Sequence, residues 1–421
     1  MDDGFALLEG RFTPTAERAA GGLVVSRTMT CSTITNMQTQ KHFDIAIVGA
    51  GVFGVWTAYQ LCRAGAKVAI IDAYGSGNSR SSSGGESRII RMGYGPDEIY
   101  SRSAVRSLKL WKEFFLRTET ADLFIKTGVL WLARETDPYC EAVAEILPRL
   151  GVSTQRLEYD ELKLHYPQLE FTEGTWGLLE PDSGALMARR AVQAVARQAQ
   201  RDGTTFLTES VVSPVQQRKL QSIETTSGLK VFADQFVFAC GPWLPKLFPE
   251  LLKDRIYVTR QEVFFFGTPS GNVSFLPDRM PIWVDFNDLV YAFPDLENRG
   301  FKLAIDAHGP EFDPDTGDRV VDKFGIAAAQ KYLRRRVPSL ANASVVESRV
   351  CQYENTSNGD FLIDRHPEIE NAWFVGGGSG HGFKHGPAVG QYVEALISGT
   401  GEVEPRFALA TKARFQQRQV F

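Results

Sequence analysis

Residues 43–54 read Phe-Asp-Ile-Ala-Ile-Val-Gly-Ala-Gly-Val-Phe-Gly, a β-rich run that leads directly into three glycines. Gly49, Gly51 and Gly54 have GxGxxG spacing. In such a turn the first glycine permits a tight bend, the second lets the backbone approach a pyrophosphate, and the third lets the helix pack closely on the strand. The pyrophosphate then lies against the N–H groups at the positive end of that helix. The stretch therefore predicts a dinucleotide site.

The residues after the glycines complete a βαβ unit. We expect a strand over residues 43–48, a helix that ends at Gly65, and a second strand over residues 67–71. Asp72 follows the second strand, where a carboxylate accepts hydrogen bonds from a ribose 2′-hydroxyl. An acid at this position disfavours a 2′-phosphate and therefore NADP. The motif alone does not separate FAD from NAD, but its place near the start of the chain favours FAD.

Composition limits the classes of partner. The chain has 421 residues, enough for two domains, and its formal net charge of −4 gives no general attraction to nucleic acid or to an anionic membrane. No apolar run reaches the length of a membrane span. The five cysteines are widely spaced and include no CxxC pair, which disfavours disulfides and a metal site and favours a reducing compartment. We predict a cytoplasmic protein with no metal and with no nucleic-acid or membrane partner.

The two ends of the chain differ from the rest. Residues 1–40 are rich in Thr, Ser, Ala and Gly without periodicity, and we expect a disordered extension; its acidic residues argue against a transit peptide. Met37 is either the natural start or part of a native tail. Residues 401–421 are expected to be a C-terminal tail, and its last three residues are not a peroxisomal address.

The remaining sequence alternates between helical and strand patterns. The helices are expected over residues 100–117, 138–150, 185–201 and 388–397. Strands are expected over residues 127–132, 232–239 and 372–375, and near Phe206 and Val211. Residues 263–303 are rich in aromatic residues and Val with turn residues between them, which predicts an antiparallel sheet that could form one wall of a substrate pocket.

Three further segments resemble one flavoprotein family. Residues 84–94 read Gly-Gly-Glu-Ser-Arg-Ile-Ile-Arg-Met-Gly-Tyr, and residues 350–353 read Val-Cys-Gln-Tyr, leading to Asp-Phe-Leu-Ile-Asp at 360–364. Residues 376–384 read Gly-Gly-Gly-Ser-Gly-His-Gly-Phe-Lys. Together with the first motif, and in this order, they resemble the monomeric sarcosine oxidase family of D-amino-acid-oxidase-like flavoproteins. The resemblance extends from about residue 41 to about residue 400.

The resemblance implies an α/β fold. In this fold an FAD-binding Rossmann-like domain is interleaved with an α+β catalytic domain built on an antiparallel sheet. Residues 41–120, 180–255 and 350–400 are expected in the FAD-binding domain. Residues 121–179 and 256–349 are expected in the catalytic domain. We also expect a monomer.

The resemblance also implies a reaction. Members of the family oxidise the C–N bond of a secondary amino acid, such as sarcosine, another N-methyl amino acid or a cyclic imino acid, to an imine, and reduce O₂ to H₂O₂. FAD is expected as a cofactor linked through a thioether to Cys351, with Gly378, Gly380 and Gly382 beside it. A nearby cation would favour the required thiolate, and Arg349 is a candidate. A dehydrogenase with another acceptor, a secondary-metabolite oxidase, a flavoprotein without turnover and an NAD-binding module stay open.

Four cations are candidates for the chemistry. An arginine binds a carboxylate bidentately and a lysine adds a point charge, and by resemblance Arg91 and Lys384 bind the substrate carboxylate. Lys384 is also expected near the flavin. Arg88 is expected beside the flavin, on the opposite face from Arg91 if the segment is extended. Lys302 is expected over the flavin, where a fixed cation would stabilise superoxide. The alternative for each is a solvated surface side chain.

Two tyrosines match family positions that line the substrate cavity. These are Tyr291 and Tyr353, for which the alternative is an ordinary core aromatic. His381 is expected to be structural rather than a catalytic base.

The chain departs from the family pattern at several positions. Ser83 and Gly84 replace histidines, and Asp306 stands where a site histidine is expected, four residues after Lys302. An acid near the amine would favour a more basic or differently shaped substrate than sarcosine. His385 replaces an apolar residue and could shape the pocket.

Overall fold

Seven strands form the sheet that carries the glycine-rich turn in the computed structural model, which describes residues 41–414. They are β1 (His42–Val48), β2 (Val68–Ile71), β9 (Thr205–Leu207), β10 (Ser222–Glu224), β11 (Lys230–Phe238), β17 (Leu362–Arg365) and β18 (Ala372–Gly376). Their order is β17-β18-β11-β1-β2-β9, and β10 also pairs with β11. Neighbouring strands from β18 to β9 are parallel. Strand β10 is antiparallel to β11, and β17 is antiparallel to β18.

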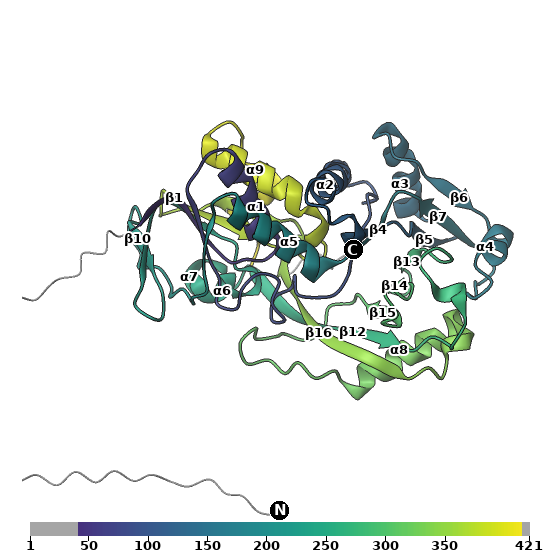
Figure 1. The fold of residues 1–421 in the computed structure, drawn as a ribbon. Coiled ribbons are helices and arrows are strands. Elements are labelled where there is room, and N and C mark those ends of the chain that lie inside the picture. Colours follow the sequence, from purple (N-terminus) through teal and green to yellow (C-terminus); the bar gives the residue numbers. More distant parts are fainter. Residues whose placement is uncertain (1–40, 415–421) are drawn as a thin grey trace, which may run out of the picture. The chain divides into compact units, whose positions relative to one another are not determined.

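Helices cover both faces of this sheet. Those involved are α1 (Val52–Arg63), α5 (Ala188–Arg201), α6 (Leu244–Leu247), α7 (Pro249–Leu252) and α9 (Gly386–Ser398). Successive side chains of a strand point to opposite faces. Ile45 and Ile47 accordingly share a hydrophobic cluster with α1, α5 and α9, whereas Ala46 and Val48 share another with α6 and α7. Figure 1 shows α1 beside both α5 and α9, its neighbours in space. This doubly covered, mostly parallel sheet confirms the predicted α/β fold.

Eight strands form a second, mostly antiparallel sheet. They are β5 (Val129–Arg134), β6 (Gln155–Leu157), β7 (Thr175–Glu180), β12 (Ile256–Phe266), β13 (Ile282–Asp285), β14 (Val290–Phe293), β15 (Phe301–Ile305) and β16 (Val345–Thr356). Their order is β16-β12-β15-β14-β13-β5-β7-β6, in which β5 and β13 are parallel. Helix α8 (Lys323–Arg336) lies along this sheet in Figure 1, and its Leu333 packs with Phe301 and Leu303 of β15. Lys302, between them, points to the opposite face.

The remaining elements lie outside the two large sheets. A small sheet contains β3 (Arg88–Ile90), β8 (Gly184–Leu186) and β4 (Phe124–Ile125), in the order β3-β8-β4. The other α-helices are α2 (Glu98–Arg117), α3 (Pro138–Arg149) and α4 (Tyr159–His165). Short 3₁₀ helices are η1 (Ala121–Leu123), η2 (Gly241–Trp243), η3 (Val273–Phe275), η4 (Pro338–Leu340), η5 (Phe383–His385), η6 (Pro405–Phe407) and η7 (Leu409–Thr411). No helix of the described residues is both long and apolar enough to cross a bilayer.

The predicted elements agree with these bounds except at a few places. The helix predicted over residues 185–201 begins at Ala188, because residues 184–186 pair with β3 and β4 as strand β8. The strand predicted near Val211 is a single bridge to Thr225. The predicted tail contains η6 and η7 within residues 401–414.

Two predictions about organisation remain open. The extension over residues 1–40, with the alternative start at Met37, lies outside the described residues. Within residues 41–414 the chain forms one compact unit, so the boundaries between two interleaved domains stay a proposal.

Candidate active site

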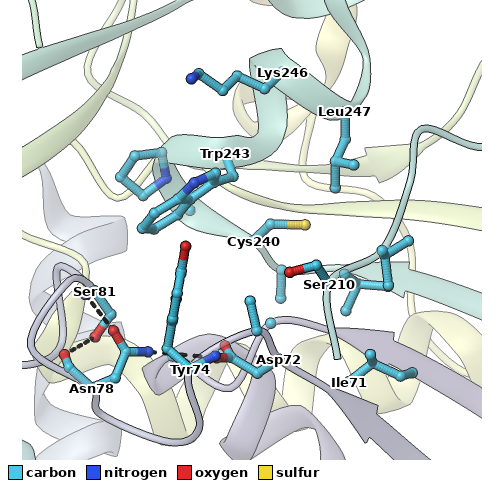
Figure 2. Close-up of a pocket in the computed structure, with 18 of the residues that line it drawn as sticks. Ile71, Asp72, Tyr74, Asn78, Ser81, Ser210, Cys240, Trp243, Lys246 and Leu247 are labelled. Carbon is cyan, nitrogen blue, oxygen red and sulfur yellow. Dashed lines mark hydrogen bonds between the residues drawn. The ribbon is translucent and has the colours of Figure 1, made fainter. Parts of the chain in front are cut away.

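A cavity of about 490 Å³ lies at the carboxyl ends of β1, β2 and β11. Ligands of open α/β sheets bind at this edge. Its lining includes the predicted residues Gly49, Gly51 and Asp72. Figure 2 shows Tyr74 and Trp243 facing each other at this cavity, with ring centroids 6.4 Å apart. A planar aromatic group could lie against these rings.

Two of the three glycines of the turn are required by close contacts, and the third leaves room. Gly49 has a φ of +106°, and a Cβ there would lie 2.3 Å from the carbonyl oxygen of Ala239. A Cβ on Gly54 would lie 1.9 Å from the carbonyl oxygen of Gly49. At Gly51 the nearest atom would be Ser83 Oγ at 3.5 Å, so the missing side chain leaves room in the cavity. This is the cradle that a pyrophosphate needs.

Asp72 is held in place by the backbone around it. Its Oδ2 accepts a hydrogen bond from the N–H of Ala50 at 2.7 Å, and its Oδ1 accepts one from the N–H of Tyr74 at 2.9 Å. Burial raises the pKa of the Asp72 carboxyl, and these backbone donors act against that shift. The carboxylate is therefore fixed at the cavity edge, where a ribose could donate to it.

A second cavity of about 100 Å³ continues from the first. The two share Gly51, Ser82, Ser83, Ala239 and Gly241. The second cavity is also lined by the predicted glycines and cysteine, namely Gly378, Gly380, Gly382 and Cys351. A Cβ on Gly382 would lie 2.9 Å from both the Cα of Gly378 and the ring of Phe53, so this loop passes close to α1.

Cys351 is buried and in contact with a cation. Arg88 Nη2 lies 3.2 Å from Cys351 Sγ, and it also donates to the carbonyl oxygen of Ser82 at 2.8 Å. Arg349, the cation considered from the sequence, donates instead to the carbonyl oxygen of Ser79. Arg88 is therefore the cation in direct contact with Cys351, and Arg349 interacts electrostatically with the same residue.

A third cavity of about 70 Å³ brings together the predicted catalytic residues. Its lining includes Arg88, Arg91, Tyr291, Lys302, Asp306, Tyr353 and Lys384. Arg88, Cys351, Tyr353, Gly380 and Phe383 line both the second and the third cavity. The three cavities thus form a series from Asp72 to Lys302.

Arg88 and Arg91 both line the third cavity, so the separation expected if the segment were extended does not occur. Strand β3 ends at Ile90, so the alternation of an extended strand does not continue through Arg91. The Arg91 guanidinium lies 4.4 Å from the ring centroid of Tyr94 and 4.7 Å from that of Trp131. These contacts hold a planar cation against two aromatic faces.

Lys302 is buried with no acidic partner in an ion pair among residues 41–414. Its Nζ donates to the carbonyl oxygen and to Oγ of Ser87, at 2.9 and 3.0 Å, and lies 4.1 Å from the ring centroid of Phe293. Burial, and after it the charge of Arg88, lower the pKa of Lys302 well below its ordinary value. An anionic group in the cavity would favour the charged form.

Lys384 is the second buried lysine of the cavity. Its Nζ donates to Tyr94 Oη at 2.7 Å and to the carbonyl oxygen of His381 at 2.9 Å. Burial, and after it the charge of Arg91, lower the pKa of Lys384 well below its ordinary value. Arg91, Lys302 and Lys384 are 5%, 3% and 4% exposed, so the alternative of solvated surface cations is wrong for all three.

Asp306 lies among these cations. Its Oδ1 accepts a hydrogen bond from Tyr353 Oη at 2.7 Å. Burial raises the pKa of Asp306 to about 6, although Tyr353 and the charges of Arg91 and Lys384 act in the opposite direction. At neutral pH the cavity therefore contains a carboxylate as well as basic groups.

Sequence reasoning missed Glu354. It lines the second cavity, and its buried Oε1 has no hydrogen-bond partner within the described chain. Burial raises the pKa of Glu354 to about 8, despite hydrogen bonds from the N–H groups of Gly377 and Gly378. The carboxyl is therefore mostly protonated at neutral pH. The one signal in the sequence was its position directly after Tyr353, within a buried segment. An acidic residue is rarely buried in a strand, so its presence there indicates a functional role.

Comparisons with known proteins agree with this geometry. The family model described as FAD dependent oxidoreductase (DAO) matches residues 44–396. Monomeric sarcosine oxidase from Bacillus sp. (strain B-0618) is 32% identical over 372 residues, which cover 86% of this chain and 94% of the relative. The chain belongs to the sarcosine oxidase branch of the DAO family. This family member is an FAD-dependent oxidoreductase.

More distant relatives share its fold. N-methyl-L-tryptophan oxidase from Salmonella heidelberg (strain SL476) is 29% identical, over 83% of this chain and 93% of the relative. The crystal structure of L-proline dehydrogenase from P. horikoshii superposes with a TM-score of 0.76 at 22% identity, covering 88% of this chain and 97% of that one. At that identity the likeness concerns the fold alone.

The residues of this DAO-family chain fit FAD. The glycine cradle suits its pyrophosphate, Asp72 suits a ribose, and the series of three cavities suits an elongated dinucleotide. No three His, Cys, Asp or Glu side chains of residues 41–414 gather where a metal ion could be held.

Proposed function

We propose that the protein oxidises the C–N bond of a small secondary amino acid to an imine and that O₂ is reduced to H₂O₂. The observation that carries this proposal is the third cavity, in which Arg91 and Lys384 accompany Asp306 beside the cofactor cavity. Two basic residues and one acid complement a zwitterion. The names of the sarcosine and N-methyltryptophan oxidases support the same class of substrate.

The substrate carboxylate binds to Arg91 and Lys384. Arg91 provides the planar fork, held by Tyr94 and Trp131, and Lys384 adds the point charge. Asp306 accepts a hydrogen bond from the substrate nitrogen. A cavity of about 70 Å³ admits only a small side chain or ring.

The chemistry that FAD would supply when bound is acceptance of the hydride equivalent from the carbon next to nitrogen. The chain's own groups hold the cofactor and orient the substrate against it. Cys351 provides the thiol for a covalent thioether, and Arg88 stabilises the thiolate that this bond requires. Tyr291 and Tyr353 line the cavity wall on the sheet side.

Lys302 provides the cation for the reaction with oxygen. Reduction of O₂ creates negative charge in a closed cavity, and a fixed ammonium stabilises it. Lys302 lies on strand β15, and its hydrogen bonds to Ser87 hold the Nζ in place before O₂ reacts.

The test is a panel of amino acids with O₂ uptake and H₂O₂ formation measured together. N-methyl amino acids and cyclic imino acids should be turned over, with equal amounts of O₂ consumed and peroxide formed, whereas matched primary amino acids should react poorly. Arg91→Ala should raise KM for the amino acid about 10- to 100-fold, the loss of a charge-assisted pair. Turnover with a dye acceptor but without O₂ uptake would replace the oxidase by a dehydrogenase.

A further inference from the structure

We propose that Tyr94, His385 and Ser103 form a proton relay that connects Lys384 in the substrate cavity with solvent beside helix α2. Lys384 Nζ lies 2.7 Å from Tyr94 Oη, Tyr94 Oη lies 2.7 Å from His385 Nε2, and His385 Nδ1 lies 2.9 Å from Ser103 Oγ. Each of these contacts is short enough for direct proton transfer along a hydrogen bond.

The relay runs from the interior to the surface. Lys384, Tyr94 and His385 are buried, at 4%, 4% and 0% exposure, whereas Ser103 is partly exposed on α2. The neighbours of Ser103 on the solvent side, Arg102 and Arg106, are exposed. A proton that reaches Ser103 Oγ can therefore pass to water.

The donors and acceptors are consistent with one direction. Lys384 has only hydrogens to donate, so Tyr94 accepts from it and is left to donate to His385 Nε2. Because Tyr94 donates to Nε2, His385 carries its hydrogen on Nδ1 and donates it to Ser103. Burial, and after it Lys384, His381 and Arg91, lower the pKa of His385 well below its ordinary value, which keeps the ring neutral.

Other groups also face the relay. Tyr94 Oη lies 3.3 Å from His381 Nδ1, but His381 Nε2 is occupied with the carbonyl oxygen of Gly359 at 3.0 Å. The groups that contact the His385 ring are Tyr94, Tyr100, Phe361 and His381. Burial raises the pKa of both tyrosines, so neither forms a stable anion. Concerted transfer through Tyr94 leaves no charge behind.

The role of the relay in turnover depends on the proposed function. A secondary amino acid binds as an ammonium ion, and its nitrogen must lose one proton before the C–N bond is oxidised. In each turnover Lys384 first passes one of its protons to Tyr94, and its neutral amine then takes the proton from the substrate nitrogen. Tyr94 passes its proton to Nε2 of His385, Nδ1 gives one to Ser103, and Ser103 gives one to water. One proton enters and one leaves, Lys384 is charged again for the carboxylate, and His385 returns by exchanging tautomers.

The first experiment does not need turnover. The chain has only six histidines, so the ¹⁵N-histidine NMR spectrum of the oxidised holoprotein contains few signals. The signals of His385 are those that disappear in the His385→Gln variant. The relay predicts a neutral His385 with its hydrogen on Nδ1 at pH 7. A doubly protonated ring, or a hydrogen on Nε2 at rest, would overturn the proposal even if no substrate is ever found.

The second experiment follows protons directly. Anaerobic stopped-flow mixing with an indicator dye in weak buffer compares proton release with flavin bleaching. Ser103→Ala and His385→Gln should slow proton release about tenfold or more. Ser107→Ala should not, since Ser107 is a buried serine one turn along α2 whose Oγ has no partner within the described residues. Unchanged release in both relay variants would contradict the relay, whereas absence of bleaching with every amine would contradict the proposed function instead.

Discussion

At the residue scale, the third cavity is distinguished by ionisable side chains that are buried. Three buried basic residues and one buried acid meet at positions far apart in the sequence, from Arg91 to Lys384. Such groups are costly to bury unless something binds to them. The pKa shifts of these buried groups allow the role of each residue to be tested separately.

Asp306 should control binding as a function of pH. Its pKa of about 6 means that it is ionised above pH 6 and neutral below it. If the carboxylate accepts from the substrate nitrogen, kcat/KM should fall as the pH drops through 6. Asp306→Asn should lose this limb and reduce kcat/KM about tenfold or more at pH 8. Steady-state kinetics between pH 5 and 8 provide the measurement, and an identical profile in the variant would exclude Asp306 from substrate binding.

Lys302 should act after the amine has been oxidised. Lys302→Met keeps the length of the side chain and removes its charge, so flavin reduction should change little while reoxidation by O₂ slows about 100-fold. Separate anaerobic and oxygen-mixing stopped-flow experiments resolve the two steps. Equal slowing of both would mean that Lys302 only supports the structure of the cavity.

Glu354 should make folding stability depend on pH. Its pKa of about 8 lies above the ordinary value of 4.5, so the native state binds more protons than the unfolded state between these values. Stability therefore falls as the pH rises through this window, by at most ~1.4 kcal/mol per pH unit. Urea unfolding at pH 5 and pH 8 should show a smaller difference for Glu354→Gln than for the wild type. The same difference in both would remove Glu354 as the cause.

At the element scale, the strand–turn–helix of residues 43–63 was predictable because its cause is local. The glycine spacing, the apolar strand and the helix after it are adjacent in sequence, and only glycine fits at Gly49 and Gly54. Lys302 was harder, since its burial follows from the alternation of β15 between α8 and the cavity. The contact between Asp306 and Tyr353 joins residues 47 apart through the packing of β15 and β16 around β12, which no local pattern contains.

The β1–α1 turn offers a matched pair of glycines. A Cβ at Gly54 would clash with the backbone of Gly49, so Gly54→Ala should separate helix from strand and abolish cofactor retention. Gly65 ends α1 with a φ of +95° and has open space around it. Gly65→Ala should cost only about 1–2 kcal/mol of stability and keep the flavin. Bound flavin per chain, from absorbance after gel filtration, separates the two outcomes, and full retention by Gly54→Ala would argue against the cradle.

At the scale of the whole molecule, the first cavity lies at one edge of the mostly parallel sheet, and the antiparallel sheet provides a wall of the third cavity. Strand β16 is the edge strand of the antiparallel sheet, and its Cys351, Tyr353 and Glu354 line the second cavity. This strand therefore connects the antiparallel sheet with the cavity that continues from the parallel sheet. The covalent bond proposed at Cys351 would therefore fix the cofactor between the sheets. The flavin should stay with the wild-type protein after acid precipitation and leave Cys351→Ala, and complete release from the wild type would contradict the covalent link.

The most direct test of the account is the absorbance spectrum of the purified protein during anaerobic addition of amino acids. We expect a flavin spectrum that a small N-methyl or cyclic imino acid bleaches, and that air restores with formation of peroxide. The matched primary amino acid should leave the spectrum unchanged at the same concentration. A flavin spectrum that no secondary amino acid bleaches would contradict the proposed oxidation of a C–N bond.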